Sequence, residues 1–140
     1  MTKEQVLQDC TIEGNVVKLP NIQLDRKDYQ EVAKALELIG GKWKGIILYH
    51  LISGTKRFNE FQKLHPCITQ RMLTLQLREL ERDGVVHREV YKEVPPKVEY
   101  SLTEFGRTLN PIILLMKDWG VKNKDRINST KAILKPQSGE

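Results

Sequence analysis

Residues 69–102 read TQRMLTLQLRELERDGVVHREVYKEVPPKVEYSL, and the spacing of their apolar residues changes at Gly84. Before Gly84, leucines recur at helical spacing, which predicts a helix over residues 69–83. After Gly84, apolar and charged residues alternate, which predicts two strands over residues 86–92 and 98–102. The stretch therefore predicts a helix followed by a two-stranded hairpin with a proline-stiffened tip.

Three further helices are predicted before this stretch. Asp28 is expected to cap a helix that ends at Ile39, because glycines follow it. The second helix is closed by Ser53-Gly54. Its core face is expected to carry Trp43, Ile46, Ile47, His50 and Leu51. A short third helix over residues 58–64 ends before Pro66, since the residue that precedes a proline avoids helical geometry.

The two ends of the chain differ in pattern. Residues 1–27 are interpreted as an arm in which Gly14-Asn15 turns between two short strands. A last helix begins at Thr103-Glu104, and its apolar residues recur at helical spacing. Within that helix, Pro111 either produces a kink or restarts the helix with Asn110 as its cap.

These elements define a domain plan and a fold class. We divide the chain into the arm (1–27), one domain (28–122) and a polar C-terminal tail (123–140). In this order of elements, two helices joined by a tight turn place the second helix in the DNA major groove, and the hairpin follows the DNA backbone. The sequence thus predicts an α+β, mainly α fold: a winged helix-turn-helix with a two-stranded wing and a C-terminal dimerisation helix.

The composition indicates one soluble domain. The chain has 140 residues, of which 39% are hydrophobic, and a net charge of +5 that favours polyanionic partners only mildly. No apolar run approaches the ~18 residues needed to span a membrane, and the first residues lack the apolar core of a signal peptide. We therefore expect a cytoplasmic protein without membrane contact, whose two cysteines stay reduced.

No residue pattern predicts catalysis. His50 lies on the apolar face of its helix, His65 precedes a proline and His87 lies in the wing, without cysteines or carboxylates at ligand spacing. The sequence contains no glycine-rich phosphate loop and no nucleophile elbow. We expect a protein that is not an enzyme and that uses neither a cofactor nor a metal.

Basic and polar residues cluster on the helix over residues 69–83 and on the hairpin after it. With Leu73 at the centre of the buried face and ~100° per residue, Arg71 and Arg78 point away from the core. Such donors suit phosphates and base edges, although a solvated helix face is the alternative. The predicted DNA-binding residues are Arg57, Thr69, Gln70, Arg71, Thr74, Arg78, Arg88, Lys92 and Lys97.

Several motifs along the chain resemble those of one known family. In order, they are Ile39-Gly40-Gly41-Lys42-Trp43, Arg57-Phe58-Asn59-Glu60-Phe61, Ile68-Thr69-Gln70-Arg71-Met72-Leu73, Leu77-Arg78-Glu79-Leu80-Glu81-Arg82-Asp83-Gly84, residues 94–103 and Trp119-Gly120. They resemble the successive motifs of the HxlR family of bacterial winged helix-turn-helix transcriptional regulators, which are MarR-like. The resemblance implies binding to double-stranded DNA.

The resemblance also implies a homodimer whose interface is built from the first and last helices. The residues expected there are Tyr29, Val32, Ile112, Leu115, Met116 and Trp119. The last helix carries more apolar surface than one small domain easily covers, which agrees with a dimer. The alternative is that this surface belongs to the intramolecular core.

The chain departs from the family in one place. Many members have a Cys-Pro pair at the start of the first helix, whose cysteine senses oxidants or electrophiles, whereas Gln30-Glu31 stand here. Cys67 is a candidate redox-sensing residue because it lies just before a helix N-terminus, which lowers the pKa of a thiol. Cys10, in the arm, is the second candidate, and an incidental role is the alternative for both.

The sequence therefore predicts a homodimeric regulator that binds a pseudo-palindromic operator, with a redox or electrophile signal as a candidate input. The residues identify no small-molecule inducer. The alternative function is a winged-helix module that contacts other proteins and has no specific DNA binding. The two functions differ in their salt dependence and in their preference for one DNA sequence.

Overall fold

The computed structural model describes residues 11–13, 16–19 and 22–134. The chain divides into two compact units, one up to Gly40 and one from Gly41, and each is described by itself. The predicted limits of 1–27, 28–122 and 123–140 differ from this division, because the helix that follows residue 28 lies in the first unit. These domain limits stay a prediction.

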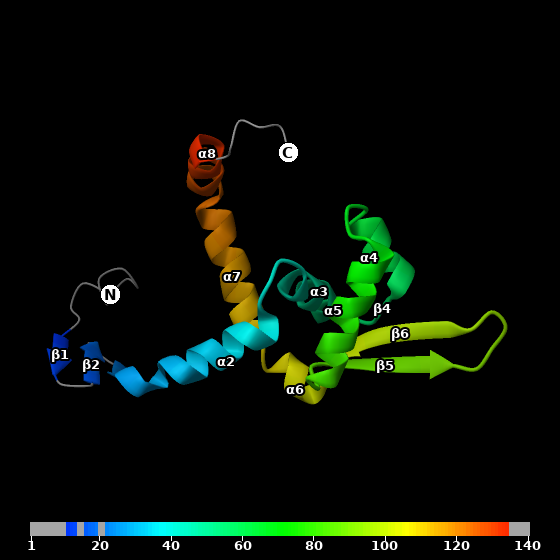
Figure 1. Cartoon of the computed structure of the whole chain (residues 1–140), viewed down its shortest axis with the longest axis horizontal. Coiled ribbons are helices and arrows are strands. Elements are labelled where there is room, and N and C mark those ends of the chain that lie inside the picture. Colours follow the sequence, from blue (N-terminus) through cyan, green and yellow to red (C-terminus); the bar gives the residue numbers. More distant parts are fainter. Residues whose placement is uncertain (1–10, 14–15, 20–21, 135–140) are drawn as a thin grey trace. The chain divides into compact units, whose positions relative to one another are not determined.

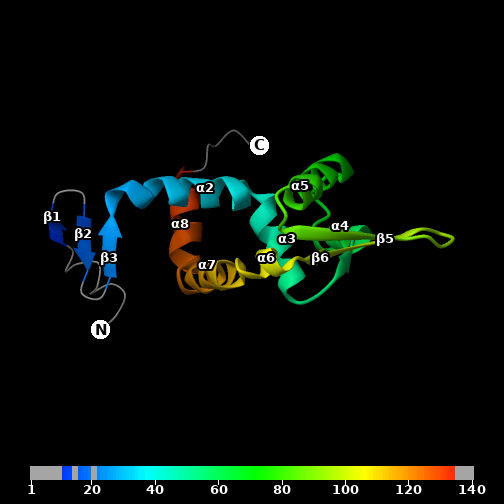
Figure 2. The same ribbon diagram turned by 90° about the horizontal axis from the view of Figure 1, so that it is seen from below.

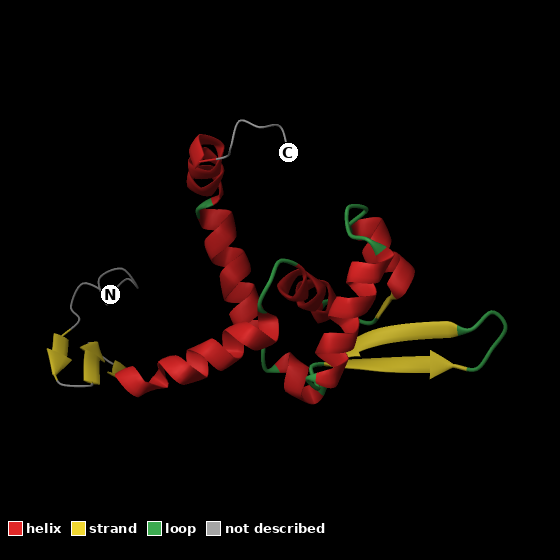
Figure 3. Cartoon of the chain, in the orientation of Figure 1, coloured by secondary structure: helices red, strands yellow, loops and turns green. Residues whose placement is uncertain are grey.

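The first unit begins with a small antiparallel sheet. Strands β1 (Thr11–Glu13), β2 (Val16–Leu19) and β3 (Ile22–Asp25) are ordered β1-β2-β3, as Figure 2 shows. Figure 3 colours the strands yellow and the helices red. The two strands expected in the arm are thus present, whereas the Gly14-Asn15 turn lies outside the described residues. Strand β3 was not predicted.

A helix completes the first unit. The short 3₁₀ turn η1 (Arg26–Asp28) leads directly into α2 (Tyr29–Ile39), the helix that the sequence predicted. Asp28 occupies the N-cap position of α2, but its side chain makes no capping hydrogen bond, so that part of the prediction is wrong. The reason is local: η1 already holds Asp28 in helical geometry, and Asp25 accepts a hydrogen bond from the Lys27 N–H instead.

The second unit contains the predicted helices and hairpin in the predicted order (Figure 1). Its elements are α3 (Trp43–Ile52), β4 (Lys56–Arg57), α4 (Phe58–Leu64), α5 (Gln70–Arg82), β5 (Val86–Tyr91), β6 (Lys97–Leu102), α6 (Glu104–Arg107), α7 (Asn110–Lys122) and α8 (Lys124–Leu134). The mainly helical α+β winged helix-turn-helix fold is therefore confirmed.

The wing is a sheet of three strands in the order β4-β6-β5. Strands β5 and β6 pair in antiparallel register from Val86 opposite Leu102 to Tyr91 opposite Lys97. Both Figure 1 and Figure 2 show this hairpin extending beyond the helices of its unit. The third strand, β4, was not predicted, since two residues are too short to show an alternating pattern.

The core of the second unit lies where α5 packs against α3 and the sheet. The predicted inward residues Leu73, Leu77 and Leu80 are almost fully buried, which confirms the periodicity of α5. The other buried apolar residues are Ile47, Leu48, Leu51, Phe61, Ile68, Val85, Val86, Tyr100, Leu102 and Ile113.

The core face of α3 differs from the prediction. Leu48, which was not assigned to the core, is buried, whereas Trp43, Ile46 and His50 are only half-buried. Helix α3 contacts α5, β6 and α7, so more than one side of it is covered. A single-face helical wheel therefore misplaces part of its core.

Between the wing and residue 134, where the described part of the chain ends, the chain forms three helices. Thr103 caps α6, because its hydroxyl accepts a hydrogen bond from the Gly106 N–H (2.9 Å) and donates one to the Gly84 carbonyl (2.6 Å). Helix α7 is a restart with Pro111 in its first turn, but its N-cap is Leu109 rather than Asn110. Helix α8 lies within the tail that was expected to be only polar.

Candidate nucleic-acid interface

Helix α5 begins at Thr69, whose side chain caps it. The Thr69 hydroxyl accepts a hydrogen bond from the Met72 N–H at 3.0 Å, so it is already used inside the helix. The Thr74 hydroxyl donates to the Gln70 carbonyl at 2.8 Å. The side chains of Gln70, Arg71 and Arg78 are exposed donors on this helix.

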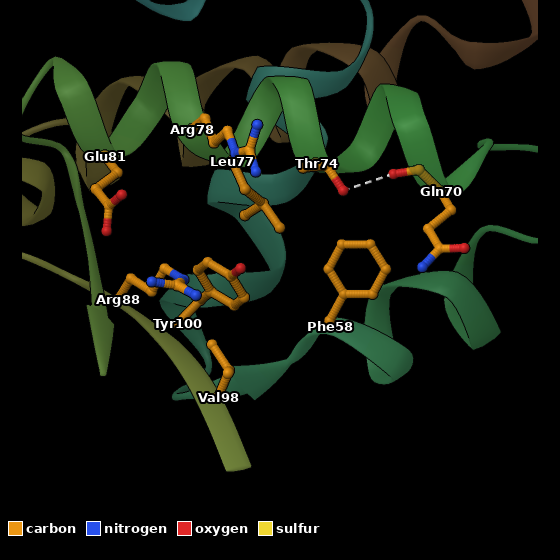
Figure 4. Close-up of a pocket in the computed structure, with 9 residues that line it drawn as sticks. All are labelled: Phe58, Gln70, Thr74, Leu77, Arg78, Glu81, Arg88, Val98 and Tyr100. Carbon is orange, nitrogen blue, oxygen red and sulfur yellow. Dashed lines mark hydrogen bonds between the residues drawn. The ribbon is translucent and has the colours of Figure 1, made fainter. Parts of the chain in front are cut away.

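A hollow of about 340 Å³ separates α5 from the wing. It is lined by Phe58, Gln70, Thr74, Leu77, Arg78, Glu81, Arg88, Val98 and Tyr100 (Figure 4). Four of the predicted DNA-binding residues meet here, with Arg78 on the helix and Arg88 on strand β5. Since Arg88 and Tyr100 are paired across β5 and β6, the sheet register aims Arg88 at this hollow.

A second hollow continues along the outer face of α5. It is lined by Thr69, Gln70, Arg71, Thr74, Leu75 and Arg78. The five residues that the sequence placed on this helix thus form one continuous exposed or half-exposed face. Helix α5 is held against α3 by the ion pair of Lys44 and Glu79 at 2.7 Å, and the Lys44 ammonium lowers the pKa of the Glu79 carboxyl.

The basic side chains of the wing differ in how available they are to bind an external anion. Lys92 follows strand β5 and is exposed. Lys97 begins β6 instead of lying at the tip, and its ammonium contacts the Glu99 carboxylate at 2.8 Å and the Tyr91 ring at 5.0 Å. The Lys97 ammonium lowers the pKa of Glu99, to which Arg57 also contributes from strand β4. Lys97 is therefore less available for an external anion than Lys92.

Five residues of the first hollow were not predicted as part of a site, and one of them, Leu77, was predicted only as a core residue. Phe58, Val98 and Tyr100 resemble ordinary core residues in the sequence, and Glu81 resembles a solvated charge. Their joint position depends on the packing of α4, α5 and the wing. The sequence carries no local signal for it.

The residues expected at a dimer interface are exposed in each unit. On α2, Tyr29 and Val32 are exposed. On α7, Ile112, Leu115, Met116 and Trp119 are exposed, while the neighbouring Ile113 is buried. The α7 residues therefore do not belong to the core of their own unit.

Cys67 lies in the segment between α4 and α5, two positions before the cap residue Thr69. Its thiol is free and exposed, and the following Ile68 is buried. Cys10 lies outside the described residues. Within residues 11–13, 16–19 and 22–134 no group of three or more histidine, cysteine or acidic side chains is placed to hold a metal. The described helices include none that is long and apolar enough to cross a membrane.

A helix-turn-helix, a basic helix face and an adjoining wing together define a winged helix-turn-helix DNA-binding protein. Residues 38–128 match the HxlR-like helix-turn-helix family, and the chain belongs to this family.

Similar proteins agree with this membership. The chain is 76% identical over 106 residues to the HTH-type transcriptional regulator YdeP of Bacillus subtilis (strain 168), a match that covers 76% of this chain and 83% of YdeP. The reduced form of the redox regulator HypR superposes with a TM-score of 0.69 at 70% identity, over 71% of this chain and 98% of HypR. Reduced YodB from B. subtilis superposes with a TM-score of 0.58 at 40% identity, over 64% of this chain and 88% of YodB. The chain is therefore an HTH-type transcriptional regulator and not an enzyme.

Proposed function

We propose that the protein binds a pseudo-palindromic operator as a homodimer in the cytoplasm, with one α5 helix and one wing from each subunit on the DNA. The observation that carries this proposal is the continuous face of Gln70, Arg71 and Arg78 on α5, beside Arg88 on the wing. A helix of this kind enters the major groove with its N-terminal residues on base edges. The wing then lies along the backbone.

The side chains divide into two roles. Gln70 and Arg71 lie in the first turn of α5, where side chains reach base edges, and an arginine pairs with guanine through two hydrogen bonds. Arg88 and Lys92 are exposed cations of the wing. Arg57 ends strand β4 and is the N-cap residue of α4, so all three suit phosphates. Lys97 contributes less, because Glu99 already holds its ammonium.

The dimer is supported by the apolar face of α7. Ile112, Leu115, Met116 and Trp119 lie on one side of this helix at helical spacing, and all are exposed. A contiguous exposed apolar surface of this kind indicates a protein interface. Two-fold symmetry of the protein is then projected onto two DNA half-sites.

We expect Arg71→Ala to weaken operator binding by about 1–3 kcal/mol and to lower the preference for the operator over random DNA. The operator is first selected from genomic fragments with the purified protein. Affinities are then measured on operator and random DNA across a salt series. Lys92→Ala is the control, since loss of a phosphate contact weakens both complexes alike and lowers the salt slope by about one.

If the ratio of operator affinity to random-DNA affinity is the same in Arg71→Ala as in wild type, α5 is not the helix that reads the bases. Weak, salt-insensitive binding of wild type to every DNA would instead favour a module for protein contact.

A redox input is a second part of the proposal. The structures similar to this chain include HypR in its reduced form, HypR in its oxidised form and YodB after treatment with diamide. We propose Cys67 as the responding thiol here, because it is exposed and lies two positions from Thr69, the cap of the reading helix. A modification at Cys67 would displace the first turn of α5 from the DNA.

We expect an alkylating quinone, or diamide together with glutathione, to abolish operator binding by wild type and by Cys10→Ser, but not by Cys67→Ser. The quinone adds to one thiolate, and diamide is reduced while one protein thiol joins glutathione in a mixed disulfide. Binding is measured before and after treatment, and mass spectrometry confirms the modification. Unaltered wild-type binding after confirmed modification of Cys67 contradicts the proposal. A loss that persists in Cys67→Ser but disappears in Cys10→Ser places the sensor in the arm.

A further inference from the structure

Two histidines from separate elements meet behind the proposed DNA-binding face. His50 lies on α3, and His65 lies in the segment between α4 and α5. Their Nε2 atoms are 2.7 Å apart and their ring centroids 4.9 Å apart, so the imidazoles meet end to end. At this distance one Nε2 carries a proton and donates it, and the other Nε2 accepts through its lone pair.

The surroundings of the pair are apolar and positively charged. The rings of Trp43 and His65 make a T-shaped contact with their centroids 5.6 Å apart, and His50 borders a hollow of about 440 Å³. That hollow is lined by Gly45, Ile46, Tyr49, His50, His65, Ile113, Met116 and Lys117, none of them a carboxylate. Lys56 from β4 acts on His50 through its charge, and Lys117 from α7 lines the hollow, where it is paired with Asp118.

These surroundings disfavour the uptake of a second proton by the histidine pair. Burial, together with the charges of His65 and Lys56, lowers the pKa of His50 below the ordinary value of 6.5. One added proton leaves an N–H donor facing a lone pair, so the contact survives. A second proton turns the accepting nitrogen into a donor and places two positive imidazoles end to end. The contact is then lost.

The position of His65 is linked to the start of α5. The His65 N–H donates to the Phe61 carbonyl at 2.9 Å, and its carbonyl accepts from the Ile68 N–H at 3.1 Å. Ile68 is buried next to Thr69, which caps α5. A displacement of His65 therefore reaches the first turn of the reading helix through these backbone hydrogen bonds.

We propose that the His50–His65 pair is an acid-sensitive latch, which holds the segment leading into α5 against α3 and opens when both imidazoles are protonated. The closed latch favours DNA binding, and the open latch weakens it. Because His50 takes up a proton less readily in the closed latch than in the open one, the latch is fully closed above pH 6.5 and opens progressively below it.

The first test follows the three histidines of the full-length protein by long-range ¹H–¹⁵N NMR across a pH series. Single replacements of each histidine by glutamine assign the signals. We expect the midpoint of His50 to lie below 6.5, because burial and the charges of His65 and Lys56 disfavour its protonated form. At neutral pH one of the pair carries its proton on Nε2 and the other on Nδ1. In His65→Gln the midpoint of His50 rises, because the neighbouring charge is absent.

The second test measures DNA affinity of wild type and His65→Gln at about pH 7.5 and about pH 5.5. Glutamine keeps a hydrogen-bonding group but cannot take up a proton, so the latch stays closed. On acidification we expect wild type to lose about three- to tenfold in affinity relative to His65→Gln, since each pH unit below 6.5 shifts the latch by up to about tenfold. His50→Gln serves as a second variant if His65→Gln does not fold.

A His50 midpoint that is the same in wild type and in His65→Gln overturns the latch even if DNA binding stands, because the NMR test does not depend on the proposed function. An identical pH dependence of wild type and both glutamine variants overturns its link to DNA. Histidine signals that change with EDTA would replace the latch by a metal site.

Discussion

Replacing Trp119 with glutamate is expected to convert the proposed dimer into monomers and to weaken operator binding by about 10²- to 10⁴-fold. The Trp119 side chain is 62% exposed in its own protomer, so the substitution costs little within the subunit. In the proposed interface, however, it introduces a charge into an apolar surface that a second copy covers. Each reading helix then binds its half-site alone, and the second contact is no longer intramolecular.

A matched control lies on the same helix. Val121 is 68% exposed and, at ~100° per residue, lies about opposite Ile112 on α7, so Val121→Glu adds the same charge outside the apolar face. Sedimentation at micromolar concentration reports the oligomeric state, and footprinting reports two half-sites about one or two helical turns apart. A dimeric Trp119→Glu variant with wild-type affinity would show that α7 is not the interface.

Leu80→Ala is expected to lower the free energy of unfolding by about 2–5 kcal/mol. The side chain of Leu80 has a relative exposure of 0%, and it lies on the inner face of α5 with Leu73 and Leu77. Its truncation removes buried apolar contacts and leaves a cavity that the surrounding helices fill only in part. The same helix supplies the control, because Leu75 is 47% exposed, so Leu75→Ala is expected to change stability by less than ~0.5 kcal/mol.

Urea denaturation measures both variants at one protein concentration, because dimerisation stabilises the folded state by mass action. A Leu80→Ala variant as stable as Leu75→Ala would mean that α5 does not bury the face assigned to it.

The local elements of this protein were predictable from its sequence. The leucine spacing of α5 and the alternation after Gly84 predicted the helix and the hairpin, since burial on one side imposes a repeat of 3.6 residues on a helix and of two on a strand. The outward face of α5 followed from the same repeat. Where an element is covered on several sides, as α3 is, the repeat no longer identifies the buried residues.

Close approaches between distant segments were not predictable. Gly106 lies against the Val85 carbonyl so tightly that a Cβ would collide with it, yet nothing near Gly106 in the sequence indicates this. Strand β4 is a similar case, because its two residues become a strand only by pairing with β6. Such contacts join residues that have no fixed spacing along the chain.

The sequence by itself determined the order of the helices from α2 to α5 and of the hairpin after them, the inward and outward faces of α5 and, through its motifs, the family. Those properties depend on short-range periodicity and on the identity of consecutive residues. Only the tertiary structure decided that Arg78 and Arg88 line the same hollow, that Glu99 forms an ion pair with Lys97, and that His50 contacts His65. Each of these contacts depends on how helices and strands pack in three dimensions. Packing brings together side chains that are not related by any regular spacing in the sequence.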